Sequence, residues 1–273
     1  STKTFFKKRC SKTVIPFVIW SVFAVIYFRV TQKNDFDTSS VRGIIDGIVN
    51  TKYVSIYWFF VGLFAVYLSI PVLSLIPKEN RNRCYLYIVI TAFVLNYAIP
   101  FVASVFPKGI PYNSSLKMFF GDQYIFYALC GWLIDNIEIK KKYRYGIYAF
   151  GLMGVLIHIF GTWYLSYRDG MFKGYMNVPC ILYSMAVFLF VKNVAINGKG
   201  IWYKKIVDFY NSTTFGVYLI HWYFIDTFLE LTKWKYYEMF RYRFWGGVVL
   251  FLVMGVVVKN VQKIRVVKKY ILP

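Results

Sequence analysis

The sequence has few cysteines, few histidines and little negative charge, and these residues form no recognisable cluster. Its 273 residues include four cysteines, two histidines and 12 acidic residues. The cysteines are isolated, with no C-x-x-C pair and no histidine or cysteine at metal-ligand spacing; they are Cys10, Cys84, Cys130 and Cys180. These absences argue against a disulfide framework and against a zinc site. We therefore expect free thiols and no bound metal.

Charged residues of both signs are also scarce. They make up 16% of the chain, whereas 58% of the residues are hydrophobic and 22% are aromatic. A water-soluble domain of this composition would have too little polar surface to cover itself. There is no internal repeat, heptad array or separate soluble segment long enough to fold alone. The composition therefore predicts an all-α fold, a polytopic bundle of transmembrane helices.

The charge that is present is strongly basic, with 33 lysines and arginines and a net charge of +21. Nucleic-acid binding is one interpretation of such an excess. The basic residues, however, fall in short clusters between apolar runs and do not follow one continuous surface. We therefore expect no nucleic-acid partner, and we interpret the clusters as charges that set membrane topology.

About eight apolar runs are long enough to be membrane spans. Residues 124–134 form the shortest, which needs protein neighbours to shelter its ends. If the N-terminus is cytoplasmic, the cytoplasmic loops hold most of the basic residues and the opposite loops hold most of the acidic ones, as the positive-inside rule requires. We therefore predict that both termini are cytoplasmic. The runs are 14–30, 53–75, 84–106, 124–134, 145–164, 176–191, 212–231 and 244–258.

His221 is the main candidate functional residue. It lies nine positions into the apolar run 212–231, roughly 13 Å along a helix and thus near the middle of a bilayer. An ionisable ring at that depth is a functional-site hypothesis. Helical spacing places Thr214, Tyr218 and Ile225 on the same face. The other histidine, His158, has no motif around it, and we interpret it as structural.

Four segments, in order, resemble the acyltransferase-3 family, integral-membrane O-acyltransferases that modify sugars and cell-envelope polymers. Residues 5–17 (FFKKRCSKTVIPF) resemble the family's basic R-x-x-R segment and the helix start that follows it. Residues 57–60 (YWFF) with 66–71 (VYLSIP) are similar to its W-F-[LF]…Y-L-x-x-P helix. Residues 213–221 (TTFGVYLIH) resemble its F-G-[IV]-Y-L-[IL]-H helix, and 127–133 (YALCGWL) resemble a glycine-containing span between them.

The resemblance covers nearly the whole chain, and the departures from the family pattern are specific. Lys12 stands where the second arginine of R-x-x-R is expected, which keeps the charge but loses the bidentate fork. Family members typically have ten core spans, and the basic segment follows the second. The resemblance therefore implies that two helices, one of which usually carries the catalytic histidine, precede Ser1. We accordingly interpret residues 1–273 as one N-terminally incomplete acyltransferase-like domain.

The resemblance implies an acyl-CoA donor, most simply acetyl-CoA, and a set of candidate contacts to it. The CoA phosphates would bind to Lys8, Arg9 and Lys12, with Lys7, Lys204 and Lys205 as further candidates; the alternative is that these residues only set topology. His221 would line the site as general base or as a positioning group, and Tyr218 would orient the imidazole or donate to the acyl carbonyl.

The saccharide or lipid-linked glycan acceptor would be held by polar and aromatic groups near the outer face. Trp58 would stack on a sugar and Asp122 would bind its hydroxyl groups, the alternatives being an aromatic belt and an ordinary interface carboxylate. Asp226 and Glu230 are weaker candidates, with Arg168 as a possible ion-pair partner.

The resulting functional prediction is a membrane O-acetyltransferase of the bacterial inner membrane. Its partners would be acetyl-CoA, the glycan acceptor and the lipid bilayer. Two alternatives stay open: a transporter or flippase for a sugar-bearing or anionic lipid, and a truncated, catalytically silent acyltransferase. The paired repeat halves with interrupted helices that often mark a transporter are not seen in the sequence.

Overall fold

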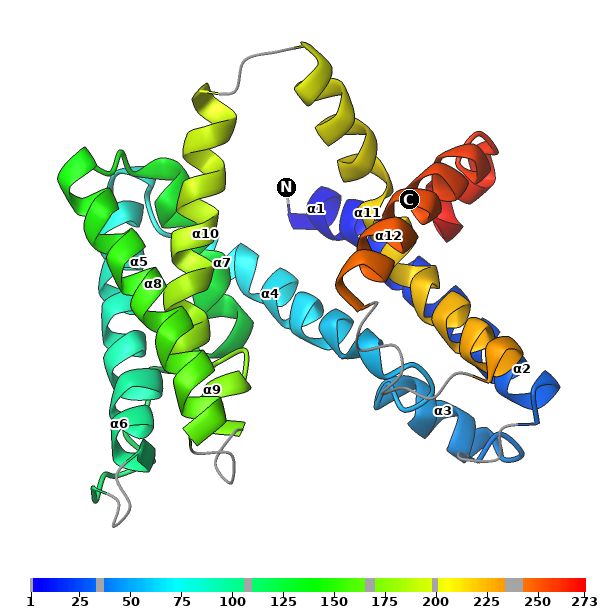
Figure 1. The fold of residues 1–273 in the computed structure, drawn as a ribbon, viewed down its shortest axis with the longest axis horizontal. Coiled ribbons are helices and arrows are strands. Elements are labelled where there is room, and N and C mark those ends of the chain that lie inside the picture. Colours follow the sequence, from blue (N-terminus) through cyan, green and yellow to red (C-terminus); the bar gives the residue numbers. More distant parts are fainter. Residues whose placement is uncertain (1, 33–36, 106–109, 165–169, 198–200, 234–242) are drawn as a thin grey trace. The chain divides into compact units, whose positions relative to one another are not determined.

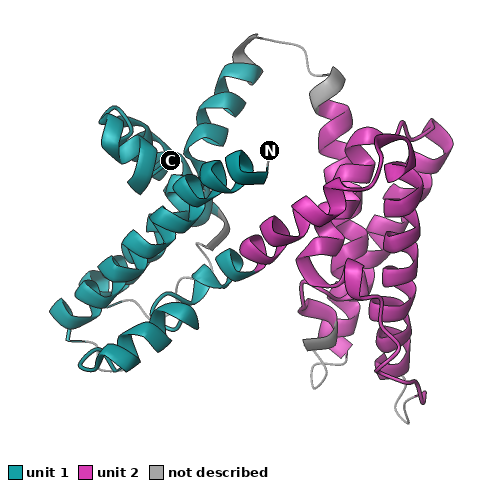
Figure 2. Cartoon of the chain, turned by 180° about the vertical axis from the view of Figure 1, so that it is seen from behind, with its two compact units in different colours: residues 1–61, 199–273 teal, residues 62–198 magenta. Residues whose placement is uncertain are grey.

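The computed structural model describes residues 2–32, 37–105, 110–164, 170–197, 201–233 and 243–273, and every regular element in these ranges is a helix (Figure 1). The all-α prediction is therefore confirmed. The chain separates into two compact units, residues 1–61 with 199–273 and residues 62–198 (Figure 2). We call them unit 1 and unit 2. The first of the two boundaries between them in the sequence falls inside one helix, α4.

Unit 1 contains both ends of the chain. Its elements are α1 (Thr2–Arg9), η1 (Cys10–Val14), α2 (Ile15–Val30), α3 (Val41–Val49), η2 (Ser55–Tyr57), the start of α4 (Trp58–Ser74), α11 (Ile201–Thr232), α12 (Arg243–Val261) and η7 (Val267–Ile271). The first three follow one another without a break, so the basic N-terminal segment is helical and continuous with the first apolar run. Close to the C-terminus, Leu272 is buried, and the carbonyl of Ile271 accepts a hydrogen bond from Trp20 Nε1 at 2.9 Å.

Unit 2 is built around long antiparallel helices. Its elements are the rest of α4, α5 (Lys78–Ala92), η3 (Phe93–Ala98), α6 (Ile99–Val105), η4 (Phe119–Gly121), α7 (Gln123–Asn136), α8 (Lys141–Tyr164), α9 (Gly170–Lys173) and α10 (Val178–Asn197). Small residues bring α8 and α10 together. A Cβ on Gly151 would lie 2.3 Å from the Cβ of Ala186, and one on Gly154 would lie 2.7 Å from the carbonyl oxygen of Pro179. Close approach through small residues is typical of membrane helices.

Two long helices widen into π-helical turns, each just before a proline. Cys10–Val14 precedes Pro16, and Phe93–Ala98 precedes Pro100. Proline has no N–H for the carbonyl four residues earlier, and its ring clashes with that carbonyl, so a wider turn accommodates it. Pro100 therefore distorts its helix without ending it, and the helix continues to Val105.

Several helices fit a membrane by length and composition. Among the described residues, four are long and apolar enough to cross a bilayer: Thr2–Val30, Ser55–Ser74, Lys78–Val105 and Lys141–Tyr164. Two shorter apolar helices cover Val178–Val194 and Trp245–Val261. Each of the eight predicted runs falls on a helix, whereas the number of crossings and the side of the termini stay predictions. The outward face of α2 is apolar, with Val18, Val22 and Ile26 about half exposed, as lipid contact requires.

The short helix α7 has the protein neighbours that its length requires. Fourteen residues span roughly 21 Å, less than the hydrocarbon thickness. One side packs with buried Tyr85 and Ile88 of α5, and the other packs with buried Ile181 of α10. At its C-terminal end, Lys192 Nζ donates to the carbonyls of Ile134 and Asp135, both at 2.7 Å. These hydrogen bonds satisfy backbone carbonyl groups at the end of α7, which lipid chains could not do.

Candidate functional site

His221 lies in the middle part of α11, and its ring is fixed by the helix that carries it. Nδ1 lies 2.9 Å from the carbonyl oxygen of Tyr218 and 3.1 Å from that of Val217. A carbonyl oxygen can only accept, so Nδ1 must carry the proton. In the neutral ring Nε2 then holds the lone pair. No hydrogen bond to Nε2 is found in the part of the chain that the structure describes, and this is the arrangement that a general base needs.

The imidazole faces a groove of about 330 Å³ between α11 and α12, which we call the His221 groove. Its α11 wall holds the four residues that helical spacing places on one face, and its α12 wall is apolar. The lining residues are Thr214, Val217, Tyr218, His221, Ile225, Gly247, Leu250 and Phe251. The groove therefore brings one imidazole and two hydroxyl groups to an otherwise apolar surface.

The close contact of α11 with α12 beside this groove depends on glycine. A Cβ on Gly216 would lie 2.6 Å from Cγ1 of Val258, closer than real side chains approach. A Cβ on Gly255 would similarly lie 2.7 Å from the ring of Tyr210. Gly216 is the glycine of the F-G-V-Y-L-I-H sequence, so its place in that motif has a packing reason: it sets the spacing of the two walls.

Tyr218 is held by a backbone group and not by the histidine. Its hydroxyl donates to the carbonyl of Ile56, just before α4, and its ring centroid lies 5.9 Å from that of His221. The phenolic proton is thus directed away from the imidazole, although the oxygen can still accept a hydrogen bond. A catalytic role for Tyr218 stays a prediction.

Tyr57 is a residue of this region to which the sequence assigned no role. It is buried, and its hydroxyl donates to the carbonyl of Leu219 at 2.8 Å. Its ring packs against Phe17 and Phe60, with centroids 6.1 and 5.6 Å away. Tyr57 thereby connects α2, α4 and α11 behind the histidine. In the sequence, only the aromatic run 57–60 pointed to this residue, and such a run does not indicate which of its rings is buried.

The basic residues Lys8, Arg9 and Lys12 are exposed on the helical segment that leads into α2. The guanidinium of Arg9 lies 5.5 Å from the ring centroid of Phe5. Tyr223 donates to the carbonyl of Trp20 at 3.0 Å, and Tyr27 donates to Asp226 at 2.7 Å, so α2 and α11 run in the same direction.

Lys204 and Lys205 lie at the start of α11, roughly 25 Å before His221 along the helix. The lysine pair precedes the apolar part of α11, and the segment around Arg9 precedes the apolar part of α2. Because α2 and α11 are parallel, both basic segments lie on the same side of unit 1. His221 lies farther along α11, inside its apolar part.

The two residues predicted to bind the acceptor belong to different units. Trp58, in unit 1, is 37% exposed and makes an edge contact with Phe59 at 6.2 Å between centroids. Asp122, in unit 2, precedes α7, and its carboxylate accepts a hydrogen bond from the backbone N–H of Gln123 at 2.9 Å. Asp122 therefore has a structural role at the start of α7, and acceptor binding by either residue stays a prediction.

The remaining polar candidates make local contacts. The carboxylate of Asp226 accepts the hydrogen bond from Tyr27, whose hydroxyl also lies 3.1 Å from that of Thr227. His158 Nδ1 lies 3.5 Å from the Tyr183 hydroxyl at the contact of α8 with α10. Arg168, the proposed ion-pair partner, lies outside the described residues. No group of three potential metal-ligating side chains occurs within the ranges that the structure covers.

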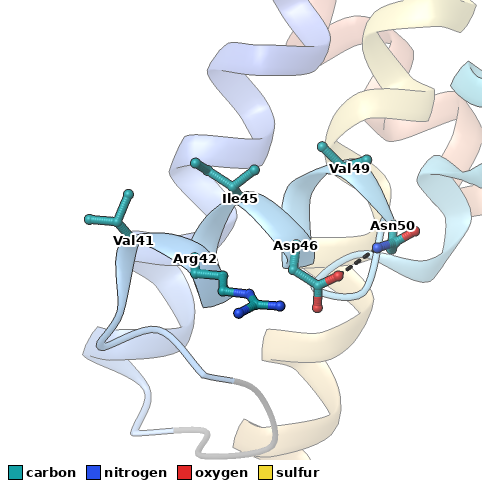
Figure 3. Close-up of a pocket in the computed structure, with 6 residues that line it drawn as sticks. All are labelled: Val41, Arg42, Ile45, Asp46, Val49 and Asn50. Carbon is teal, nitrogen blue, oxygen red and sulfur yellow. Dashed lines mark hydrogen bonds between the residues drawn. The ribbon is translucent and has the colours of Figure 1, made fainter.

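One hollow of unit 1 is an open surface on α3 (Figure 3). All its lining residues come from one helix, so no second element converges there. The Lys52 ammonium, 2.5 Å from Asp46, and then the Asn50 amide, at 2.6 Å, donate to that carboxylate and lower its pKa. Val41, Ile45 and Val49 form an exposed apolar stripe beside it. These features fit an amphipathic connector between spans.

Comparison with known protein families gives a match. Neither a search of curated proteins nor a search of solved structures finds one for this chain. The model of the acyltransferase-3 family, described as an acyltransferase domain, matches residues 1–259. This match includes the basic segment, α11 and the His221 groove, and it runs through both units. The chain therefore belongs to the acyltransferase-3 family and is a membrane acyltransferase.

Proposed function

We propose that the protein is an O-acetyltransferase of the bacterial inner membrane. It would transfer the acetyl group of acetyl-CoA to a hydroxyl of an extracytoplasmic or lipid-linked saccharide. Family membership supports acyl transfer in general. The observation that carries the finer proposal is His221, whose Nδ1 is anchored by the carbonyls of Tyr218 and Val217 while the ring lines a groove.

The chemistry follows from that geometry. Nε2 takes the proton of the acceptor hydroxyl as its oxygen attacks the thioester carbonyl carbon. The new C–O bond forms, the C–S bond breaks, and the CoA thiolate leaves with the proton returned by the imidazolium. The carbonyl oxygens at Nδ1 hold the ring in the required tautomer and favour the transient positive charge. His221 would be the catalytic base, with Tyr218 positioning the helix beside η2.

The basic segment would hold the donor. CoA is a polyanion, and Lys8, Arg9 and Lys12 are exposed together before α2. Because α2 and α11 are parallel, the phosphates would bind on one side of unit 1 while the flexible arm of CoA carries the thioester towards His221. Trp58 and Asp122 are proposed to contact the saccharide acceptor.

The test is acyl transfer from radiolabelled acetyl-CoA in inverted membrane vesicles, with label followed into saccharide and lipid fractions. His221→Asn keeps an amide donor near the Nδ1 position but removes the base, so we expect kcat to fall about 10²- to 10⁴-fold. His158→Asn is the matched control, and it should leave transfer close to wild type. The double variant Arg9→Ala/Lys12→Ala should raise KM for acetyl-CoA about tenfold or more, with a smaller change in kcat.

Two outcomes would contradict the proposal. Equal rates for His221→Asn and His158→Asn would remove His221 as the base. If no label enters any acceptor extract above empty vesicles, whereas the vesicles move a sugar-bearing or anionic lipid between leaflets, the transporter alternative replaces the enzyme.

A further inference from the structure

Unit 2 contains a second groove, of about 280 Å³, formed by α4, α5 and α7. We call it the Arg81 groove. Its walls are mostly apolar, with one charged side chain at one end. The lining residues are Val66, Ser69, Ile70, Leu73, Ser74, Arg81, Tyr85, Ile125, Ala128, Leu129 and Trp132.

The floor of the groove is packed, and its sides are open. Tyr85 and Leu129 are buried, and the ring of Tyr85 meets that of Trp132 edge to face, with centroids 4.8 Å apart. Most of the other lining side chains are half-buried, and Ala128 is exposed. From Ser74 to Val66 the groove follows α4 for roughly 12 Å. It is a long apolar slot on the surface of a membrane-protein unit.

Arg81 places a positive charge at the end of this slot. Its Nε donates to the carbonyl of Ile76 at 2.8 Å, and Nη2 donates to that of Ser74 at 2.7 Å. A guanidinium has five N–H donors, so further donors remain. Both partners are neutral, and within the described residues no carboxylate contacts Arg81. Lys78, three positions earlier on α5, is exposed and adds a second cation on the same face.

The charged end of the groove coincides with the basic end of unit 2. Lys192 of α10 binds the last carbonyls of α7, and Arg144 of α8 donates to Asn193 of α10, so the ends of these helices meet. The cluster Lys140–Lys142 lies at the same turn. By the positive-inside rule this end faces the cytoplasmic leaflet, where anionic phospholipids are attracted by such clusters.

We propose that the Arg81 groove binds one anionic phospholipid of the cytoplasmic leaflet. One fatty-acyl chain would lie in the apolar slot against Trp132 and Leu129, and the phosphate would accept hydrogen bonds from the Arg81 guanidinium, with Lys78 nearby. Water is a poor occupant because the walls offer it few partners. Any lipid chain can fill the slot, so selectivity comes from the charge at its end. A guanidinium that no carboxylate of the described residues contacts favours an anionic headgroup over a zwitterionic one. This inference is independent of the transferase proposal.

The experiment uses the whole protein in nanodiscs of phosphatidylcholine and phosphatidylglycerol in equal parts, released into detergent and examined by native mass spectrometry. We expect one retained phosphatidylglycerol per chain. Arg81→Gln removes the charge, and Ala128→Phe fills the slot while leaving the arginine in place. Each should lower retention about tenfold. Arg83→Gln is the matched control: it lies about 200° around α5 from Arg81, outside the groove, and should retain lipid like the wild type.

The result that would overturn the proposal is retention of phosphatidylcholine and phosphatidylglycerol in equal amounts, or no retained lipid. A loss in Arg83→Gln as large as in Arg81→Gln would show only general surface attraction. A phosphate adduct formed with inorganic phosphate alone, and no lipid adduct from nanodiscs, would assign Arg81 to a free anion. Because Arg81 also binds the end of α4, Ala128→Phe keeps the test valid if Arg81→Gln fails to fold.

Discussion

The two grooves are both mainly apolar, but they differ in the polar group that each presents. The His221 groove presents an imidazole whose Nδ1 is fixed by two carbonyls of its own helix. The Arg81 groove presents a guanidinium at the basic end of unit 2. An imidazole can gain and lose a proton near neutral pH, whereas a guanidinium stays charged. The first is suited to proton transfer, and the second is suited to recognition of an anion.

The difference also concerns depth. His221 lies well inside α11, while Arg81 lies in the first turn of α5, next to the end of α4. A permanent charge is tolerated at the membrane interface, where it can reach headgroups, and a neutral ring is tolerated deeper. The position of each group within its helix therefore supports the chemistry proposed for it.

The strongest test of this contrast is to add one methyl group to a helix contact in each unit. Gly216→Ala places a Cβ against Val258, and Gly151→Ala places one against Ala186. Such overpacking typically costs about 1–3 kcal/mol, so both variants should melt at lower temperature in detergent. Only Gly216→Ala moves a wall of the His221 groove, and it should also slow acetyl transfer.

The matched rescue is Gly216→Ala with Val258→Ala, which removes the contacted methyl groups and should restore both melting and transfer. If Gly151→Ala slows transfer as much as Gly216→Ala does, at equal loss of stability, the His221 groove is not specifically involved. The comparison between the units would then fail.

A smaller effect is expected from Tyr218→Phe. This change removes only the hydrogen bond to the Ile56 carbonyl. One such bond contributes about 1 kcal/mol, so we expect an approximately fivefold loss of kcat/KM and an unchanged pH profile of the rate. A loss as large as that of His221→Asn, with an altered pH profile, would instead show that Tyr218 takes part in the reaction. Tyr27→Phe, which removes a hydroxyl outside the groove, is the control.

The positions of most helices could be predicted because an apolar run of sufficient length indicates a membrane span. The run 84–106, for example, matches a helix described from Lys78 to Val105, and residue 106 lies outside the described residues. The true helix starts were missed where helices extend into charged sequence. The helix of His221 begins at Ile201, and the first helix begins at Thr2. Hydropathy detects only the apolar part, but backbone hydrogen bonding continues through lysine and arginine.

The site residues that share one helix could be predicted, but the residues that other helices contribute could not. The period of 3.6 residues correctly placed Thr214, Tyr218 and Ile225 on the face of His221. The opposite wall comes from α12, and the contact of Tyr57 with Leu219 joins residues far apart in the sequence. A single sequence carries no periodic signal for such contacts, and the Arg81 groove was missed for the same reason.

The smallest expected effect is the loss of stabilisation of the loop before α3 in acid. Ser40 and then Ser39 donate to Asp37, which lowers the pKa of that carboxyl from its ordinary value of 3.8. The folded state binds the proton less readily than the unfolded loop does. The stabilisation is therefore complete above about pH 4 and is lost as the pH falls below that value.

Hydrogen exchange of the α3 amides measures this loss. At neutral pH, the α3 amides of the wild type should be more protected from exchange than those of Asp37→Asn, by less than about fivefold. The stabilisation from exposed polar contacts is in this range. The two proteins should converge in acid. The first turn of α5 should show no such convergence when wild type and Arg81→Gln are compared, because the guanidinium stays charged. If acid lowers the difference in protection equally at α3 and at the first turn of α5, the effect of pH does not distinguish unit 1 from unit 2.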